Sequence, residues 1–172
     1  MHVEYRRASQ VYEDVVSNVV DLGMVAYPSK ASGLEIVPLR KDPLVLICHP
    51  QHPLAKLKTV KLKALAGQKF VNFEADVPTR KALDRILRER RVQVVNVMEF
   101  DNIETVKRAV EIDAGVSIVP AVTVKEEVAS GTLVAVPFTE AGLERQLAVI
   151  YKSNKSLSPA MKQFIAVLKG PL

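Results

Sequence analysis

The chain has 172 residues, of which 48% are hydrophobic and 25% charged, and its formal net charge is +5 at pH 7. This balance suits one ordinary domain or two small lobes with a buried core, and it excludes a disordered, collagen-like or low-complexity chain. Its single cysteine, Cys48, excludes an intramolecular disulfide and a cysteine zinc site.

The first third of the chain alternates helical apolar spacing with continuous apolar runs. Five valines within residues 10–20 recur at helical spacing and predict a helix there. The apolar runs at residues 22–26, 34–39 and 44–48 predict three strands, because a strand covered on both faces is continuously apolar. Pro50 then breaks the pattern.

The middle of the chain predicts two strand–helix units. Residues 70–73 read as a strand, and Thr79 is a candidate N-cap for an amphipathic helix over residues 80–91. Residues 94–100 read as the next strand, and Asp101 or Asn102 caps the helix that follows.

The last third continues the same alternation. Gly115 is expected to end the preceding helix as a left-handed C-cap, and Pro120 is expected at the first position of a further helical piece. The remaining expected elements are a strand at 116–119, a helical end near Gly131, strands at 132–137 and 146–151, and a helix from Pro159.

Strands that alternate with helices predict an α/β fold built from βαβ units, with largely parallel sheets. We expect two lobes, residues 1–68 plus 133–172 in lobe I and residues 69–132 in lobe II. Two crossings between the lobes would leave a cleft where strand ends meet helix N-termini, which is a usual ligand site.

Several segments follow one another in the order of a known family. They are VVDLGMVA (19–26), PLVLICHPQHPLA (43–55), LKAL (62–65), TRKALD (79–84), VEIDAGVSIVP (110–120), GTLV (131–134) and LSPAMKQFI (157–165). Together they resemble the effector-binding domain of LysR-type transcriptional regulators over essentially the whole chain. The stretch 110–120 departs from the family pattern, because Asp113 or Ala114 replaces one glycine of the usual pair.

This resemblance implies a two-lobe, periplasmic-binding-protein-like (type 2) fold with two mostly parallel sheets and a cleft. The first lobe is expected to be incomplete at its N-terminus, lacking the family's first strand and helix, and no winged helix-turn-helix precedes it. The implied function is sensing of a small metabolite, with an anion favoured, in a dimeric regulator that reaches DNA only through the missing N-terminal domain. No cofactor, metal or membrane contact is expected, and no apolar run approaches the roughly 18 residues that cross a bilayer. With no signal-peptide pattern at its start, the chain is expected to be soluble and cytoplasmic.

Candidate effector contacts combine the family's site with the physics of helix starts. Unpaired N–H groups at a helix N-terminus favour an anion, so residues 74–79 are the best candidate segment. Glu74 and Asp76 would oppose an anion there and would favour an amine or a neutral effector. The full candidate set is Ala26, Tyr27, His49, Glu74, Val77, Pro78, Thr79, Asn102, Val119 and Pro120. By analogy with the family, the dimer interface would contain Tyr12, Val16, Ser17, Lys162 and Phe164.

Plainer interpretations of the same residues stay open. Thr79 would then be only an N-cap and Arg80 a solvated charge, His52 a structural turn residue, and Cys48 a small buried hydrophobe. Two other functions also stay open: a solute-binding protein of a transport system, and an enzyme on the same scaffold, such as a prephenate dehydratase. The enzyme is disfavoured, because Lys81 replaces the Phe of that family's Thr-Arg-Phe motif and no other catalytic motif is present.

Overall fold

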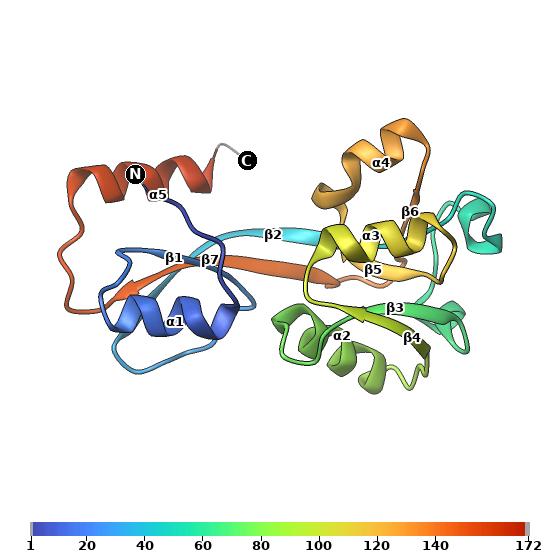
Figure 1. Cartoon of the computed structure of the whole chain (residues 1–172), viewed down its shortest axis with the longest axis horizontal. Helices are drawn as coiled ribbons and strands as arrows, with labels where there is room; N and C mark the ends of the chain where they lie inside the picture. The colour runs from blue at the N-terminus through green and yellow to red at the C-terminus, as the bar shows by residue number, and fades with distance from the viewer. Residues whose placement is uncertain (1, 171–172) are drawn as a thin grey trace. The chain divides into compact units, whose positions relative to one another are not determined.

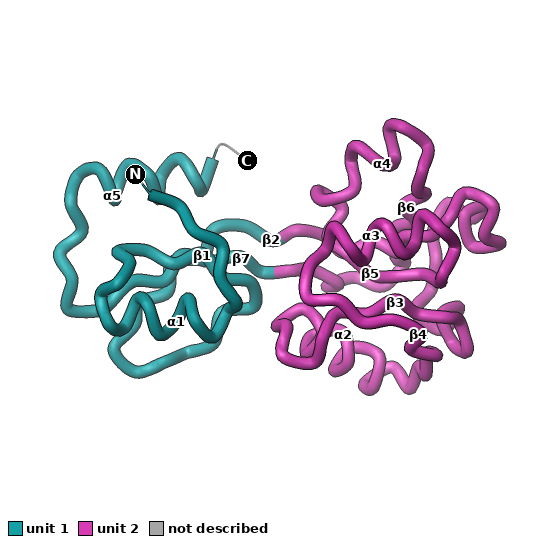
Figure 2. Tube along the Cα trace, viewed as in Figure 1, with its two compact units in different colours: residues 1–41, 146–172 teal, residues 42–145 magenta. Residues whose placement is uncertain are grey.

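A computed structural model describes residues 2–170, and these divide into two compact units (Figure 1). Unit 1 comprises Met1–Lys41 and Gln146–Leu172, and unit 2 comprises Asp42–Arg145 (Figure 2). The lobes expected from the sequence divide the chain at other residues, and that division stays a prediction. Every helix within residues 2–170 is too short or too polar to cross a membrane.

Unit 1 is small and has a small core. Its elements are α1 (Ala8–Val16), β1 (Gly23–Ala26), the first half of β2 (Leu34–Cys48), most of β7 (Glu144–Lys152) and α5 (Pro159–Lys169). Strand β1 pairs antiparallel with β7, from Gly23 opposite Ile150 to Ala26 opposite Leu147. Only Val15, Val25 and Ile150 form the fully buried cluster among the described residues of this unit.

Unit 2 carries the larger core and most of the regular structure. In chain order its further elements are η1 (Pro53–Lys56), η2 (Leu62–Leu65), β3 (Lys69–Phe73), α2 (Pro78–Glu89), β4 (Val95–Phe100), α3 (Ile103–Glu111), β5 (Ser117–Pro120), η3 (Ala121–Val124), α4 (Lys125–Ser130) and β6 (Val134–Pro137). The second half of β2 also lies here, so β2 continues across the boundary between the units (Figure 2).

The α/β fold expected from the sequence is present, but the strand pairs do not show the mostly parallel sheets. Strands β3 and β4 are parallel, and a parallel bridge between Phe70 and Val116 ties β3 to β5. The pairs β1–β7, β2–β5 and β2–β6 are antiparallel. Strand β2 is central to this difference, because it runs against both β5 and β6.

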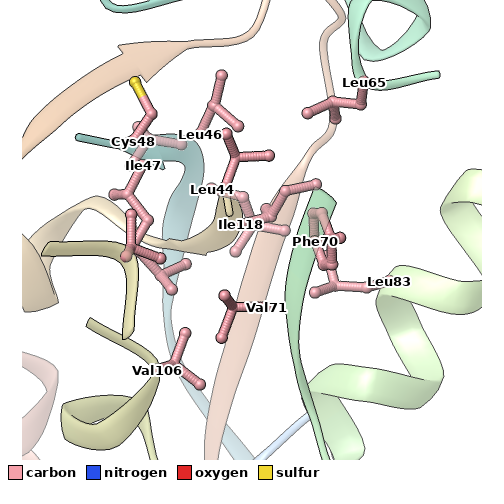
Figure 3. Packing of buried hydrophobic residues seen from close by; sticks show 14 of the residues in the cluster. Leu44, Leu46, Ile47, Cys48, Leu65, Phe70, Val71, Leu83, Val106 and Ile118 are labelled. Carbon is pink, nitrogen blue, oxygen red and sulfur yellow. The ribbon is translucent and has the colours of Figure 1, made fainter. Parts of the chain in front are cut away.

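The core of unit 2 is built from the apolar strands predicted from the sequence. Leu46, Ile47 and Cys48 on β2 are fully buried, as is Phe70 on β3. Figure 3 shows these side chains packed with others from α2, α3 and β5, such as Ile118. The continuous apolar pattern of residues 44–48 therefore does mark a strand covered on both faces.

Three predicted element boundaries are wrong. Residues 34–39 and 44–48 form one strand of 15 residues, β2, despite the prolines and charges between them. Helix α1 ends at Val16 rather than Val20, because Asn18 takes a left-handed conformation (φ 59°). Pro120 is the N-cap of η3 rather than its first residue.

Gly115 is not the left-handed cap of α3. The helix ends at Glu111, and the left-handed residue is Asp113 (φ 58°), whose N–H donates to the carbonyl of Val110. Gly115 has another role: a Cβ there would lie 2.6 Å from the carbonyl oxygen of Lys69. Glycine therefore lets the chain before β5 approach the start of β3.

Candidate functional site

The carboxyl ends of three strands meet at one edge of unit 2. Phe73 at the end of β3 lies opposite Phe100 at the end of β4, and the N–H of Glu74 donates to the carbonyl of Phe100. Strand β5 runs parallel to β3 and ends at Pro120. We call this the carboxyl edge, and such edges are common ligand sites in α/β proteins.

Most predicted effector contacts in unit 2 lie at the carboxyl edge. They are Glu74, Val77, Pro78 and Thr79 after β3, Asn102 after β4, and Pro120 at the end of β5. Val119 lies beside them in sequence but is fully buried in the core. The carboxyl edge therefore collects the segment 74–79 and two strand-to-helix corners.

Helix α2 begins without a side-chain cap. Its N-cap is Val77, and Pro78 occupies the first turn, where its fixed φ and missing N–H are tolerated. The prediction that Thr79 is the N-cap is wrong, since Thr79 lies inside the first turn. Thr79 is 8% exposed, and its hydroxyl belongs to the first turn of α2. The start of α2 thus offers backbone N–H groups that its N-cap residue does not satisfy, beside the Thr79 hydroxyl.

Arg80 is neither a solvated charge nor a free ligand. Its Nη1 donates to the carbonyl of Phe73 and to Glu99 on β4, both at 2.7 Å. Its Nε lies 2.9 Å from both carboxylate oxygens of Asp84. Burial acts to lower the Arg80 pKa, but the hydrogen bonds to Glu99 and Asp84 outweigh it, so the pKa is raised. Arg80 therefore fixes the start of α2 to the ends of β3 and β4.

Helix α3 begins with a side-chain cap, and of the two candidates Asp101 and Asn102 it is Asn102 that provides it. The Asn102 Oδ1 accepts the N–H of Thr105 at 3.0 Å and its hydroxyl at 3.0 Å. The Asn102 Nδ2 donates to Asp101 at 2.8 Å. Because these bonds occupy the Asn102 side chain, α3 offers fewer free groups to a ligand than α2.

The corner after β5 is held by a buried lysine. The Thr123 hydroxyl donates to the carbonyl of Pro120 at 2.7 Å, and Lys107 Nζ donates to the carbonyl of Thr123 at 3.1 Å. Lys107 also forms ion pairs with Glu127 at 2.7 Å and Glu104 at 2.9 Å. The Lys107 side chain is 7% exposed, so this corner depends on a desolvated charge network.

His49 lies away from the carboxyl edge. Strand β2 is antiparallel to β5, with Leu44 opposite Pro120 and Ile47 opposite Ser117, so the end of β2 is at the other edge of the sheet. The His49 Nδ1 accepts the N–H of Gln51 at 3.2 Å. The neighbouring His52 caps η1 by accepting the N–H of Leu54, which is the structural role expected for it.

Ala26 and Tyr27 belong to unit 1. Ala26 pairs with Leu147 on β7, and the Tyr27 N–H donates to the carbonyl of Gln146 at 2.8 Å. Tyr27 has φ 50°, which is uncommon for a bulky residue and is often found at functional sites. The cleft expected between two lobes stays a prediction.

One charged pair at the carboxyl edge had no sequence signal. Asp42 Oδ2 and Arg145 Nη2 lie 2.8 Å apart, and their side chains are 6% and 19% exposed. Asp42 comes two residues before Leu44, which pairs with Pro120. No local pattern marks two residues that are 103 positions apart.

Within residues 2–170, no group of three His, Cys, Asp or Glu side chains is placed to hold a metal ion. The Cys48 thiol is buried, and that burial, with a smaller contribution from Asp113, raises its pKa to about 11. Such a thiol stays protonated at neutral pH and is a weak nucleophile.

Comparison with known proteins gives matches along almost the whole chain. The model of the family described as LysR substrate binding domain matches residues 1–171. The chain is 34% identical over 148 residues to a RuBisCO operon transcriptional regulator of Allochromatium vinosum, a match that covers 86% of this chain and 49% of that protein. It is 28% identical to the HTH-type transcriptional activator CmpR of Synechocystis over 92% of this chain and 52% of that protein. The chain thus spans about half the length of the curated relatives it matches.

Solved structures also match along almost the whole chain. The regulatory domain of CcmR from Synechocystis in complex with 2-PG superposes with a TM-score of 0.87 at 26% identity, over 98% of this chain and 81% of that one. The effector-binding domain of QuiR in complex with shikimate superposes with a TM-score of 0.82 at 22% identity, over 95% of this chain and 77% of that one. The second match bears on the fold alone.

Proposed function

The chain belongs to the LysR substrate binding domain family, and we propose that it senses a small anionic metabolite at the carboxyl edge of unit 2. LysR-type regulators are transcription factors rather than enzymes, and the relatives are named as transcriptional regulators. The family match supports this function over the solute-binding protein and the prephenate dehydratase that the sequence left open. The transcriptional output, contact with DNA and a cytoplasmic location are part of the proposal.

The observation that carries the proposal is the start of α2. Its N-cap Val77 provides no side-chain cap for the first N–H groups, and the Thr79 hydroxyl lies in the same first turn. Together they form a set of donors at the positive end of the helix, which favours a carboxylate or phosphate. Arg80 holds this set in place through Phe73 and Glu99.

The effector acts by selecting between conformations of the regulator. A ligand shifts such an equilibrium only when it binds one state more tightly than the other. Effector contacts at the start of α2 would supply that difference in affinity between the two states. Arg80 joins this helix to the ends of β3 and β4, so a contact made by the helix also bears on those strands. Of the predicted contacts, Thr79, Pro78 and Val77 belong to this helix start, and Asn102 and Pro120 line the neighbouring corners.

A second copy of this chain is the partner that the proposal includes. Unit 1 leaves apolar side chains exposed near the predicted interface, such as Val16 at 46% and Val19 at 68% on and after α1. Val167 on α5 is 69% exposed, beside the predicted interface residues Lys162 and Phe164. Sedimentation velocity over a range of concentrations tests this association, and replacing Val16 and Val167 with Ser is expected to shift the equilibrium toward monomer.

A thermal-shift titration tests the effector site. The probes are 2-PG, shikimate and a panel of phosphorylated acids, dicarboxylates and aromatic carboxylates, each titrated at fixed ionic strength. A saturable rise in Tm with at least one of them is expected. Thr79→Val removes the hydroxyl without changing the shape of the side chain, so it is expected to weaken that probe by about fivefold.

Thr59→Val is the matched control, because Thr59 is exposed and lies outside the carboxyl edge. It is expected to leave the affinity unchanged. If Thr79→Val and Thr59→Val change the affinity for the probe equally, the start of α2 is not part of the binding site. A panel in which no anion binds saturably would contradict the proposed ligand class.

A further inference from the structure

A cavity of about 460 Å³ is lined by residues from the second half of α2 and from the segment that leads into β4. Figure 1 shows the chain turning from the end of α2 back into β4. Strands β3 and β4 begin at this edge, with Lys69 opposite Val95, so the cavity is at the amino edge of these strands. The lining residue nearest the start of α2, Asp84, lies six residues after Pro78, about 9 Å along the helix, and Arg88 lies ten residues after it, about 15 Å. The cavity is therefore distinct from the carboxyl edge.

The lining of the cavity is amphipathic. The buried side chains of Leu87 and Val92, with the half-buried Val94, contribute its apolar part. The exposed Arg88 and Arg91 contribute two guanidinium groups. Asp84 also lines the cavity, and both of its carboxylate oxygens lie 2.9 Å from the Nε of Arg80, a cation that it shares with Glu99.

The arginines around this cavity differ from the others in the chain. Arg85, Arg88 and Arg91 make no side-chain hydrogen bond or ion pair within residues 2–170, and the charge of Arg90 acts on Glu140. The remaining arginines have partners: Arg6, Arg80, Arg108 and Arg145 are ion-paired, and Arg7 and Arg40 also interact. Unpartnered guanidinium groups are thus concentrated in residues 85–91, next to the cavity.

The backbone at Arg91 supports a binding role. Helix α2 ends in a Schellman motif, in which the Val92 N–H donates to Leu87 and the Arg91 N–H donates to Arg88. This motif places Arg91 in the left-handed conformation (φ 53°), which favours glycine. The motif's two hydrogen bonds also occupy the carbonyls of Leu87 and Arg88 at the negative end of the helix. These carbonyls therefore repel a bound anion less than free carbonyls would. An arginine here is a poor choice for stability alone.

We propose that this cavity binds a small amphipathic anion, whose phosphate or carboxylate contacts Arg88 and Arg91 and whose apolar body contacts Leu87 and Val92. Its volume is within the range of small-molecule sites. Two guanidinium groups beside an apolar wall recognise both parts of such a ligand. This second site is independent of the effector site proposed at the carboxyl edge.

An NMR titration of the ¹⁵N-labelled chain tests the proposal with three probes. Phenyl phosphate carries both the charge and the apolar body, whereas inorganic phosphate and phenol each carry one of them. Phenyl phosphate is expected to shift the amide resonances of Val92 and Val94 saturably, and the other two probes are expected to bind at least about tenfold more weakly. Thr79→Val is expected to leave these shifts unchanged, which separates this site from the carboxyl edge.

Two variants and a control make the test specific. Arg88→Gln and Arg91→Gly are each expected to weaken phenyl phosphate by about tenfold. Arg91→Gly is also expected to melt no lower than the parent chain, because glycine suits the left-handed position. Arg85→Gln is the control, because Arg85 is exposed on the same helix without lining the cavity.

The proposal is overturned if the Val92 and Val94 amides show no saturable shift, or if inorganic phosphate binds as tightly as phenyl phosphate. It is also overturned if Arg85→Gln weakens binding as much as the cavity variants, since that would indicate general surface charge. If Arg91→Gly lowers the melting temperature, the proposal is judged on Arg88→Gln instead. An Arg88→Gln variant that binds phenyl phosphate as tightly as the parent chain overturns the proposal.

Discussion

Asp42 and Arg145 form an ion pair 2.8 Å long between residues that are 103 positions apart in the chain. They are the first and last residues of unit 2. Asp42 lies on β2 and Arg145 on β7, which are neighbouring strands. The pair therefore joins the two strands by which the chain enters and leaves the unit.

Replacing Asp42 with Asn is expected to destabilise the protein by about 2 kcal/mol, because it leaves the partly buried Arg145 charge without its carboxylate. The Arg145 Nε is already buried without a hydrogen-bond partner, so the variant would leave the guanidinium with still fewer hydrogen bonds. Urea unfolding measures the change. Asp84→Asn is the control: its carboxylate pairs with Arg80 but is 40% exposed, so the expected loss is about 1 kcal/mol or less. Equal losses of unfolding free energy in the two variants would show that the burial of the Asp42–Arg145 pair adds nothing to its contribution.

The Lys107 network should be the most costly polar site to break. Lys107→Met would leave Glu127, whose side chain is 11% exposed, without its cation, and Glu127 Oε2 is already buried without a partner. A loss of about 2–4 kcal/mol is expected in urea unfolding at pH 7. Arg108→Met on the same helix is the control, because the Arg108 side chain is 73% exposed.

The same network predicts how the loss depends on pH. The hydrogen bond from Lys107 lowers the Glu127 pKa below its ordinary value of 4.5, against the opposing effect of burial. A carboxylate with a lowered folded-state pKa adds stability above pH 4.5, and that stability is lost as the pH falls through the folded-state pKa. The difference between the parent chain and Lys107→Met should therefore shrink as the pH falls below 4.5. A difference that stays constant down to pH 3 would mean that Lys107 acts by packing alone.

Sequence pattern predicts those elements that are determined by residues close together in the chain. The apolar periodicity of α2 and the cap of α3 depend on neighbours a few positions away. The helix was predicted, and the cap was narrowed to Asp101 or Asn102. The sequence pattern places the start of α2 two residues late, because it identifies Thr79 as the N-cap, whereas Pro78 is the first residue of the helix. Both residue types favour helix starts, and only the structure separates them.

What could not be predicted depends on contacts between distant segments. Gly115 was interpreted as a helix cap, but its requirement comes from Lys69 on another strand. His49 was grouped with Thr79, yet the antiparallel direction of β2 places it at the other edge of the sheet. A single sequence holds no local record of strand direction or of close backbone approach.

The Cys48 thiol is expected to resist alkylation in the folded protein. Burial raises its pKa to about 11, with a smaller contribution from Asp113, so the thiolate is scarce at pH 7–8. Iodoacetamide labelling followed by mass spectrometry should show little modification under native conditions and full modification in denaturant. Rapid native labelling would mean that β2 opens on the timescale of the experiment.

Asp113→Gly is expected to stabilise the protein by about 1 kcal/mol. Asp113 occupies the left-handed position after α3, where Schellman bonds join its N–H to Val110 and the next N–H to Ala109. Glycine adopts this conformation without the steric cost that a side chain carries. The melting temperature and the urea midpoint should both rise, and a fall in either would show that the Asp113 carboxylate contributes more than its conformation costs.

Gly115→Ala, two residues later, is expected to have the opposite sign. The new Cβ would lie 2.6 Å from the Lys69 carbonyl oxygen, which is backbone and cannot rotate away. The Lys69 carbonyl also accepts the Val116 N–H at 2.8 Å, so moving it weakens the junction of β3 and β5. A loss of about 1–3 kcal/mol is expected in urea unfolding. Gly67→Ala is the matched control, because no atom lies within 4 Å of its added Cβ and only its left-handed φ of 73° opposes the change. A smaller loss at Gly115 than at Gly67 would show that the backbone relaxes around the new methyl group.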